Sequence, residues 1–85
     1  MPTISMFYGI EIQMYYNDHL PPHFHAYYQG EEAIFSLDGT LIKGSLARRA
    51  CRLVQDWAEL HIQELERNWD LAREKAALEK IPPLN

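Results

Sequence analysis

The chain has 85 residues, of which 47% are hydrophobic and 24% are charged, and its formal net charge is -4. This length and composition indicate one small globular domain, residues 1–85, and exclude a disordered chain. The negative net charge disfavours binding of nucleic acid through bulk electrostatics, although an acidic chain can still carry a local basic patch.

The single cysteine, Cys51, cannot form an internal disulfide. The sequence also shows no basic-then-apolar leader and no apolar run of about 18 residues that would suggest a membrane span. We therefore expect a reducing, cytoplasmic location and no contact with a membrane.

The start of the chain has the alternating pattern of a half-buried β-strand. Within residues 4–16, Ile10, Ile12 and Met14 alternate with polar residues and should share one face. Gly9 indicates a bulge or a tight turn inside this segment. The pattern predicts one strand that is half buried against a core.

Further strands follow a proline-containing loop. The loop Asn17–Pro22 interrupts the alternation, because its prolines lack backbone N–H donors. A second strand begins at His23 and turns back at Gln29–Glu31. The pair Asp38-Gly39 favours a two-residue type I′ hairpin turn before the last strand. These signals predict an antiparallel meander of about four strands over residues 3–44.

The second half of the chain is helical. Apolar residues recur at spacings of three and four over Leu46–Leu60, and Ser45 is suited to the N-cap. Farther on, the apolar stripe moves around the helix, which indicates a break near Asn68, a second helix or a curved helix. We predict an α+β fold in which one long or two consecutive helices, residues 46–80, pack on one face of the sheet. The proline-containing residues 81–85 should form an extended tail.

The best candidate for a site is a cluster of three of the four histidines, His19, His23 and His25. Residues two apart on a strand point to the same side, so His23, His25 and Tyr27 should share a face while His19 approaches from the loop. Histidine titrates near neutral pH and is the commonest neutral metal ligand, so the cluster suggests proton transfer or metal binding.

Three uses of this cluster stay open. His23 and His25 could hold a metal ion with a third ligand from His19, Asp18 or Glu11, leaving an open position. Without a metal, the histidines could perform acid/base chemistry with a nearby phenol, as in metal-independent RNA-cleaving enzymes. Alternatively, the imidazoles only bond loop carbonyls and fix the start of the strand.

The catalytic candidates are therefore His19, His23, His25 and Tyr27, and the metal-ligand candidates are His19, His23 and His25. No metal motif of fixed spacing is present, and no cofactor is predicted.

A second candidate site lies at the predicted start of the helical region. Arg48, Arg49 and Arg52 crowd the first two turns, where the helix dipole favours acidic rather than basic side chains. They could bind an anion such as phosphate, or the carboxylates of a partner. The alternative, which we favour, is that they are solvated or paired with Asp56.

The chain also resembles a known family. The resemblance covers nearly the whole chain and is carried by Met1–Ile4, Met14–His19, Pro21–Ala26 and Arg49–Leu65. These segments resemble the family called domain of unknown function 4160, whose Pro-Pro-His-Phe-His motif maps onto residues 21–25. Where many relatives have a proline after the leucine, this chain has Leu46-Ala47.

The resemblance implies a small bacterial protein of no established activity. Members are often encoded beside a protein of another family, domain of unknown function 2442, an arrangement that has led to proposals of a toxin and antitoxin pair. We therefore rank first an interaction protein with a cognate small protein partner, for which binding of operator DNA through the complex and homo-oligomerisation stay open.

The second hypothesis is an enzyme. In a nuclease-like toxin, His23 and His25 would perform acid/base chemistry while Arg48 and Arg52 hold a phosphate. In the metal-dependent version, the cluster of His19, His23 and His25 would hold the ion.

Overall fold

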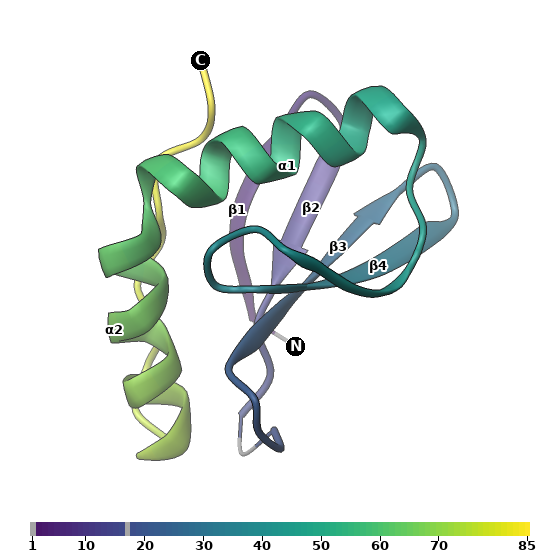
Figure 1. Ribbon diagram of the computed structural model, residues 1–85. Coiled ribbons are helices and arrows are strands. Elements are labelled where there is room, and N and C mark those ends of the chain that lie inside the picture. The colour runs from purple at the N-terminus through teal and green to yellow at the C-terminus, as the bar shows by residue number, and fades with distance from the viewer. Residues whose placement is uncertain (1, 17) are drawn as a thin grey trace.

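The computed structural model describes residues 2–16 and 18–85. In it, five strands form one antiparallel sheet in chain order, namely β1 (Thr3–Phe7), β2 (Ile10–Gln13), β3 (His23–Tyr28), β4 (Glu31–Ser36) and β5 (Leu41–Gly44). Two helices follow, α1 (Arg48–Leu60) and α2 (Ile62–Arg73). Helix α1 lies across the sheet, whereas α2 turns down along one side of it (Figure 1). The predicted α+β class is confirmed, with five strands rather than four.

The additional strand arises from a tight turn at Tyr8-Gly9. Both residues have positive φ, 50° and 79°, as a two-residue type I′ hairpin turn requires. Phe7 therefore pairs with Ile10, and the single strand predicted for residues 4–16 is a hairpin. The sequence indicated a bulge or tight turn at Gly9 but not a hairpin, because a tyrosine in the left-handed region costs about 1–3 kcal/mol and is not expected at such a turn.

The hairpin at Asp38-Gly39 differs from the predicted type I′ turn. Gly39 has a φ of 93°, but Asp38 is not among the residues with positive φ. Instead, the Asp38 carboxylate accepts a hydrogen bond of 3.0 Å from the Thr40 N–H, and the Ser36 N–H donates to the Thr40 carbonyl at 2.9 Å. Residues 37–40 thus form a longer loop that is held by an aspartate side chain.

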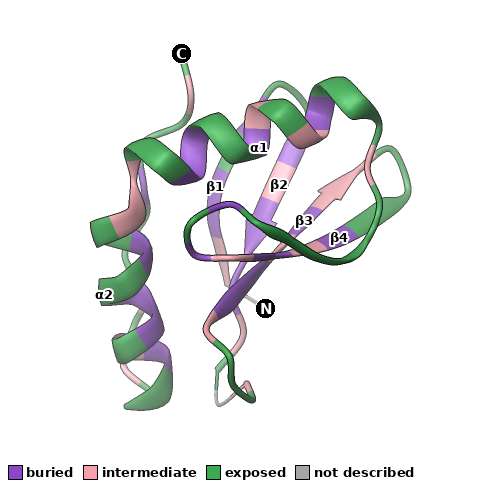
Figure 2. Ribbon diagram, in the orientation of Figure 1, coloured by how far each residue is buried: buried purple, intermediate pink, exposed green. Residues whose placement is uncertain are grey.

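The hydrophobic core lies between one face of the sheet and α1. Ile10, Ile12 and Met14 are completely buried, as their alternation predicted. Phe24 of β3 contacts the edge of Trp57 of α1, with ring centroids 5.7 Å apart. Figure 2 shows the buried residues on the inner sides of the strands and helices.

Helix α1 begins later than predicted. Its N-cap position is Ala47, which makes no side-chain cap, so the predicted cap at Ser45 is wrong. The Ala47 N–H instead donates a hydrogen bond of 2.9 Å to the carboxylate of Glu31. The glutamate thus fixes the backbone of the N-cap residue, and residues 45–47 connect β5 to α1.

The helical region is broken at His61 rather than near Asn68. Asn68 is buried within α2, where its amide donates to the Glu79 carbonyl at 2.8 Å and accepts from the Glu79 N–H at 2.9 Å. This contact requires the chain to turn back, so α2 ends at Arg73 and the helix predicted as far as residue 80 is too long.

The returning segment covers one edge of the sheet. Ile81 is 4% exposed, and its N–H donates a hydrogen bond of 2.8 Å to the carbonyl of Ile4 in β1. The Trp57 indole N–H donates to the Pro82 carbonyl at 2.9 Å, so the expected tail at residues 81–85 is packed against the domain. The opposite edge is β5, whose four residues are all exposed.

Asn17, where the sequence predicts the proline loop to begin, lies outside the described residues. Within the described part of the chain, neither helix combines the length and the apolar character needed to cross a bilayer.

Substituting Asn68→Ala should lower the free energy of unfolding by about 1–3 kcal/mol, because both backbone groups of Glu79 lose their partners. The measurement is urea denaturation. The control is Gln63→Ala at an exposed position of α2, which should change the free energy of unfolding by less than about 0.5 kcal/mol. Equal effects of the two substitutions would contradict the role assigned to Asn68.

Candidate metal centre

The sheet face that points away from α1 carries polar side chains. The register places Gln13, His25 and Ile34 side by side on neighbouring strands, and likewise Glu11, Tyr27 and Glu32. Hydrogen bonds and close polar contacts join most of this face into one row of side chains, composed of Thr3, Glu11, Gln13, Tyr15, Tyr27, Glu32, His25, Asp18 and His23. The row runs from β1 to the loop before β3, and three of its members converge at the loop end.

These three are His23, His25 and Asp18. The alternation of β3 sets the two imidazoles on the same side, with ring centroids 5.3 Å apart, as the sequence predicted. The loop brings Oδ2 of Asp18 to 2.8 Å from Nε2 of His23 and 3.5 Å from Nε2 of His25. One ligand atom from each residue lies within 4.8 Å of the other two.

The outer nitrogen of each imidazole has a fixed hydrogen-bond acceptor. Nδ1 of His23 lies 2.7 Å from the carbonyl oxygen of Pro21, and Nδ1 of His25 lies 2.9 Å from Oε2 of Glu32. Because both partners can only accept, each Nδ1 carries the hydrogen and donates it. Both Nε2 atoms are thereby directed to Asp18.

His25 has an unsatisfied atom in this arrangement. Its Nε2 is buried and has no hydrogen-bond partner among the described residues, since the distance to Asp18 is too long for a good hydrogen bond. Among the described residues, Ser5 Oγ is the other such side-chain atom, but it lies on the core face of β1. Leaving a buried polar atom without a partner costs about 1–3 kcal/mol, so this atom requires an explanation.

Asp18 is held in its ionised form. Burial acts to raise the pKa of its carboxyl group, but hydrogen bonds from the His19 backbone N–H and from the His23 ring outweigh this effect. The pKa of Asp18 therefore lies below its usual value, and a carboxylate faces the two Nε2 atoms at neutral pH.

Glu32 is in turn fixed by the rest of the row. The hydrogen bond from His25 is the main cause of its lowered pKa, and a hydrogen bond from Tyr27 lowers the pKa further against the effect of burial. Burial raises the pKa of Tyr27, as do its hydrogen bonds with Tyr15 and Glu32, so the phenol stays protonated and can donate. Tyr15 also donates to Oε1 of Gln13 at 3.0 Å.

Tyr27 shares the face of His25 and His19 approaches from the loop, as predicted, but neither is among the three residues that converge. The side chain of His19 is 90% exposed, and its Nδ1 lies 3.0 Å from Oδ1 of Asp18. His23 and His25 lie near the other carboxylate oxygen, Oδ2. Tyr27 stacks on His25 with ring centroids 6.4 Å apart and supports Glu32. Of the three alternatives for a third ligand, the structure places Asp18 at the cluster, while Glu11 is bonded to Thr3 and Gln13.

A small cavity opens beside the cluster. Its volume is about 220 Å³, and it is bounded by residues 18–21, by the two histidines of β3 and by Ile34, Ile42 and Lys43. Beside the cluster, the walls of this cavity are therefore mainly apolar side chains and one cation, Lys43. An ion held at the cluster would be reached from this cavity. The loop and β5 provide the walls of this cavity, which strand alternation alone did not indicate.

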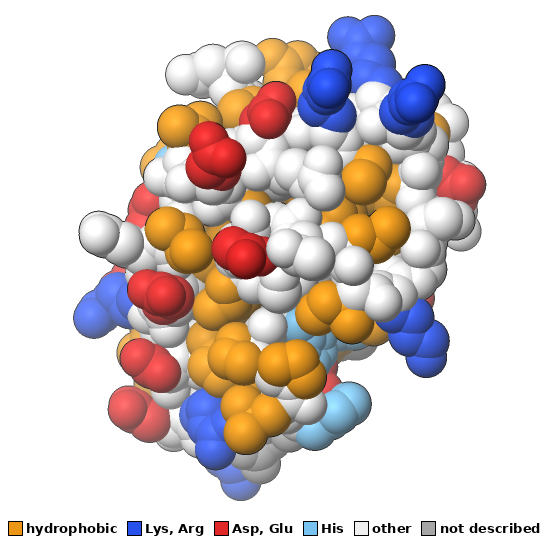
Figure 3. Space-filling view, in the orientation of Figure 1, with side chains coloured by type: hydrophobic (Ala, Val, Ile, Leu, Met, Phe, Trp, Pro, Cys, Tyr) orange, Lys and Arg blue, Asp and Glu red, His pale blue; other side chains and the backbone are white. Residues whose placement is uncertain are grey.

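The arginines lie elsewhere. Arg48, Arg49 and Arg52 are exposed at the start of α1, and none of them forms an ion pair within the described residues, so the suggested pairing with Asp56 is not observed. They border other cavities than the histidines do. Figure 3 shows basic side chains gathered at the end of the molecule where α1 begins, away from the histidines. The two groups of candidate residues therefore do not meet at one phosphate.

Fold and site together define a small α+β domain with a histidine and carboxylate cluster on its open sheet face. The family model described as Domain of unknown function (DUF4160) matches residues 9–70, and the chain belongs to this family. The matched region includes Asp18, His23, His25 and the arginines of α1. No curated protein and no solved structure matches the chain.

The tautomer of His25 can be measured in the metal-free protein by the ¹⁵N chemical shifts of its ring. We expect a hydrogen on Nδ1 and a free lone pair on Nε2, because Glu32 accepts from Nδ1. In Glu32→Ala, this preference should be lost at His25 and retained at Nδ1 of His23, which bonds the Pro21 carbonyl. A hydrogen on Nε2 of wild-type His25 would contradict the assignment.

Proposed function

We propose that this protein binds one divalent transition-metal ion through His23, His25 and Asp18 and functions as a metal-dependent enzyme. The observation that carries the proposal is the commitment of both Nδ1–H groups to fixed acceptors, which leaves two Nε2 atoms and one carboxylate facing each other. Histidines that bind metals commonly donate their other N–H to a carboxylate or a backbone carbonyl, as these two do.

A metal ion would also resolve the unsatisfied polar contact in the cluster. Nε2 of His25 would gain a partner for its lone pair. Nε2 of His23 would bind the ion instead of sharing a hydrogen with Asp18 at 2.8 Å. A purely structural role, in which the cluster only attaches the loop to β3, accounts for the His23 contacts but not for the burial of an unpartnered nitrogen.

The donor set favours particular metals and reaction classes. Two imidazoles and one carboxylate suit zinc and ferrous iron rather than calcium or magnesium. Three protein ligands leave at least one position for water or a substrate on the side of the 220 Å³ cavity. When bound, such an ion supplies Lewis-acid chemistry or an activated water.

Titration of the apo protein with Zn²⁺ or Co²⁺ tests this proposal. We expect one equivalent to bind, with Co²⁺ giving visible absorption bands. His25→Ala and Asp18→Ala should each weaken binding at least about tenfold, and Glu32→Ala should weaken it by about 10- to 100-fold through His25. Isothermal titration calorimetry measures the affinities, and circular dichroism verifies that each variant is folded.

The matched control is His61→Ala, which removes a histidine that lies between α1 and α2 and bonds Glu64 at 2.5 Å. Its metal affinity should equal that of the wild type. The proposal fails if the wild type binds no stoichiometric metal, or if His61→Ala weakens binding as much as His25→Ala does.

A second candidate function is binding of a protein partner at β5. Residues 80–81 cover the edge of β1, whereas β5 pairs with β4 alone among the residues that the structure describes and exposes Leu41 and Ile42 by 41% and 48%. An exposed edge strand can accept a strand from another chain. The family resemblance suggests a protein of the family domain of unknown function 2442 as this partner, in a toxin and antitoxin-like module.

Substitution of Leu41→Lys should weaken binding of such a partner at least about tenfold, because a charge on an edge strand opposes strand addition. Leu60→Lys is the control, since Leu60 is 68% exposed at the end of α1 and lies in no strand. Calorimetry with the co-expressed partner measures both affinities. Equal loss of affinity in both variants would contradict docking at β5. If the wild type forms a dimer and Leu41→Lys dissociates it, this edge binds a second copy of the chain instead.

A further inference from the structure

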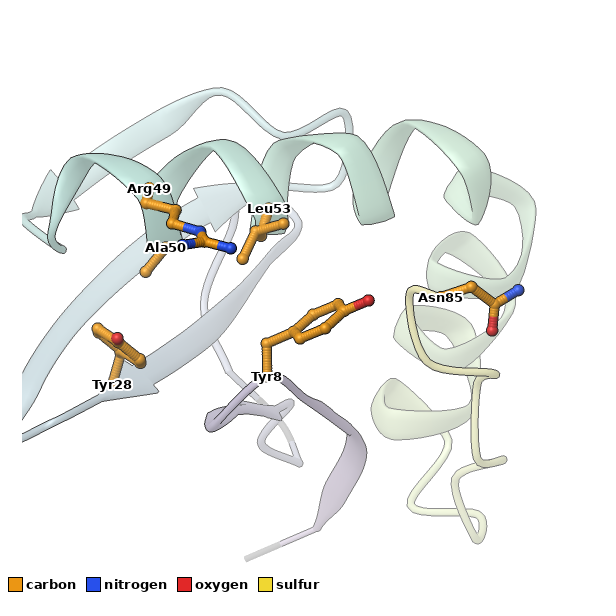
Figure 4. A pocket seen from close by; sticks show the side chains of 6 residues that line it. All are labelled: Tyr8, Tyr28, Arg49, Ala50, Leu53 and Asn85. Carbon is orange, nitrogen blue, oxygen red and sulfur yellow. The ribbon is translucent and has the colours of Figure 1, made fainter.

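A separate cavity lies on the α1 side of the sheet. Its volume is about 390 Å³, within the range of about 300–1,000 Å³ that is typical of ligand pockets, and it shares no residue with the candidate metal centre. It is lined by Tyr8, Tyr28, Arg49, Ala50, Leu53 and Asn85. Figure 4 shows Arg49, Ala50 and Leu53 along α1, with the two tyrosines facing them from the strand side.

Tyr8 is in an unusual position. It has a φ of 50° in a turn where asparagine, aspartate or glycine is favoured, and its side chain is 58% exposed. Neither turn geometry nor burial therefore explains a tyrosine here, and strained residues of this kind concentrate at functional sites. The ring of Tyr28 lies next to the same turn, because a Cβ atom at Gly9 would be 3.7 Å from its Cε1.

Arg49, which supplies the positive charge at the cavity, has no evident role in stabilising the fold. Arg49 is exposed and has no carboxylate partner among the described residues. It also borders a neighbouring hollow of about 760 Å³ that is lined in part by Arg48 and Arg52. Three arginines without an ion-pair partner among the described residues thus line two adjoining cavities, which share Arg49. They form a local basic patch on a chain whose net charge is -4.

We propose that this cavity binds a nucleotide unit of single-stranded nucleic acid. The base stacks on Tyr8 or Tyr28 above the apolar floor of Ala50 and Leu53, and Arg49 binds its phosphate. Arg48 and Arg52 bind the phosphates of adjoining nucleotides. This function is additional to metal binding and requires none of its residues.

The combination of groups favours this ligand over others. A duplex keeps its bases stacked inside the helix, where tyrosine rings at a cavity do not reach them. An acidic peptide would use the arginines but would not need two tyrosines beside an apolar floor. A free nucleotide offers the same base and phosphate, but it would leave Arg48 and Arg52 unoccupied.

Binding can be measured by calorimetry at low ionic strength with three probes, namely adenosine monophosphate, a single-stranded adenylate hexanucleotide and a blunt duplex. We expect the hexanucleotide to bind at least about tenfold more tightly than the mononucleotide, and the duplex to bind more weakly than the hexanucleotide. Equal affinities for the first two probes would assign the cavity to free nucleotides. No binding of either would overturn the proposal.

Two substitutions separate specific binding from general attraction. Arg49→Gln should weaken hexanucleotide binding at least about tenfold, whereas Arg73→Gln, an equal change of charge at an exposed position in the last turn of α2, should change it less than about twofold. Equal losses in the two variants would overturn the proposal.

Tyr8→Asn gives the most discriminating measurement. Asparagine is favoured at this turn position, so the urea midpoint should rise while hexanucleotide affinity falls. A lower midpoint would show that Tyr8 serves the fold, and an unchanged affinity would show that its ring does not contact the ligand. Either result would overturn the role proposed for Tyr8.

Discussion

Both the core and the polar face depend on the alternation of the central strand β3. Phe24 and Ala26 point into the core, where Phe24 packs between Phe35 and Trp57. Because side chains of a strand alternate, this packing fixes the opposite direction for His23 and His25. A slip of one residue in the register would place two imidazoles in the core and a phenylalanine on the polar face. The orientation of the candidate ligands is therefore a consequence of the packing of β3 against α1.

The C-terminal segment determines which surfaces remain available. Asn68 fixes the backbone of Glu79, and Ile81 then bonds to β1. This return closes the sheet on one side, so the sheet has a single uncovered edge at β5 in the part of the chain that the structure describes. The same strand contributes Ile42 and Lys43 to the cavity beside the candidate metal centre. A chain that added to β5 would thus lie next to this cavity, which connects the two candidate functions in space.

The sequence predicted the features that depend on local periodicity. Burial of Ile10 and Ile12 and the common face of His23 and His25 follow from the period of a strand. It indicated a bulge or tight turn at Gly9 but not a hairpin at Tyr8-Gly9, since a tyrosine with positive φ contradicts the preferences on which turn prediction rests. The end of α2 was also missed, because it is decided by the contact of Asn68 with a residue eleven positions later in the chain.

The third candidate metal ligand could not be predicted for a similar reason. Asp18, Glu11 and His19 are all residue types that can bind a metal, and only the path of the loop and the cross-strand partners distinguish them. Thr3 and Gln13 donate hydrogen bonds to the carboxylate of Glu11, whereas the carboxylate of Asp18 faces both imidazoles. No sequence motif indicates Glu32, whose place opposite Tyr27 follows only once the strands are paired. Residues that orient a ligand from a neighbouring strand become visible only when the register is known.

Each of the two proposed sites contains a feature that lowers the stability of the folded protein, and the two features differ. At the cluster, a buried nitrogen of His25 has no partner in the described part of the chain, and at the Tyr8-Gly9 turn an exposed aromatic residue takes a strained conformation. Both features cost stability in the absence of a ligand, and a bound ligand would compensate for them. The sites lie on opposite faces of the sheet, and they share no residue. Because they have no common partners, their ligands should stabilise the protein independently, so that the increases in the free energy of unfolding add.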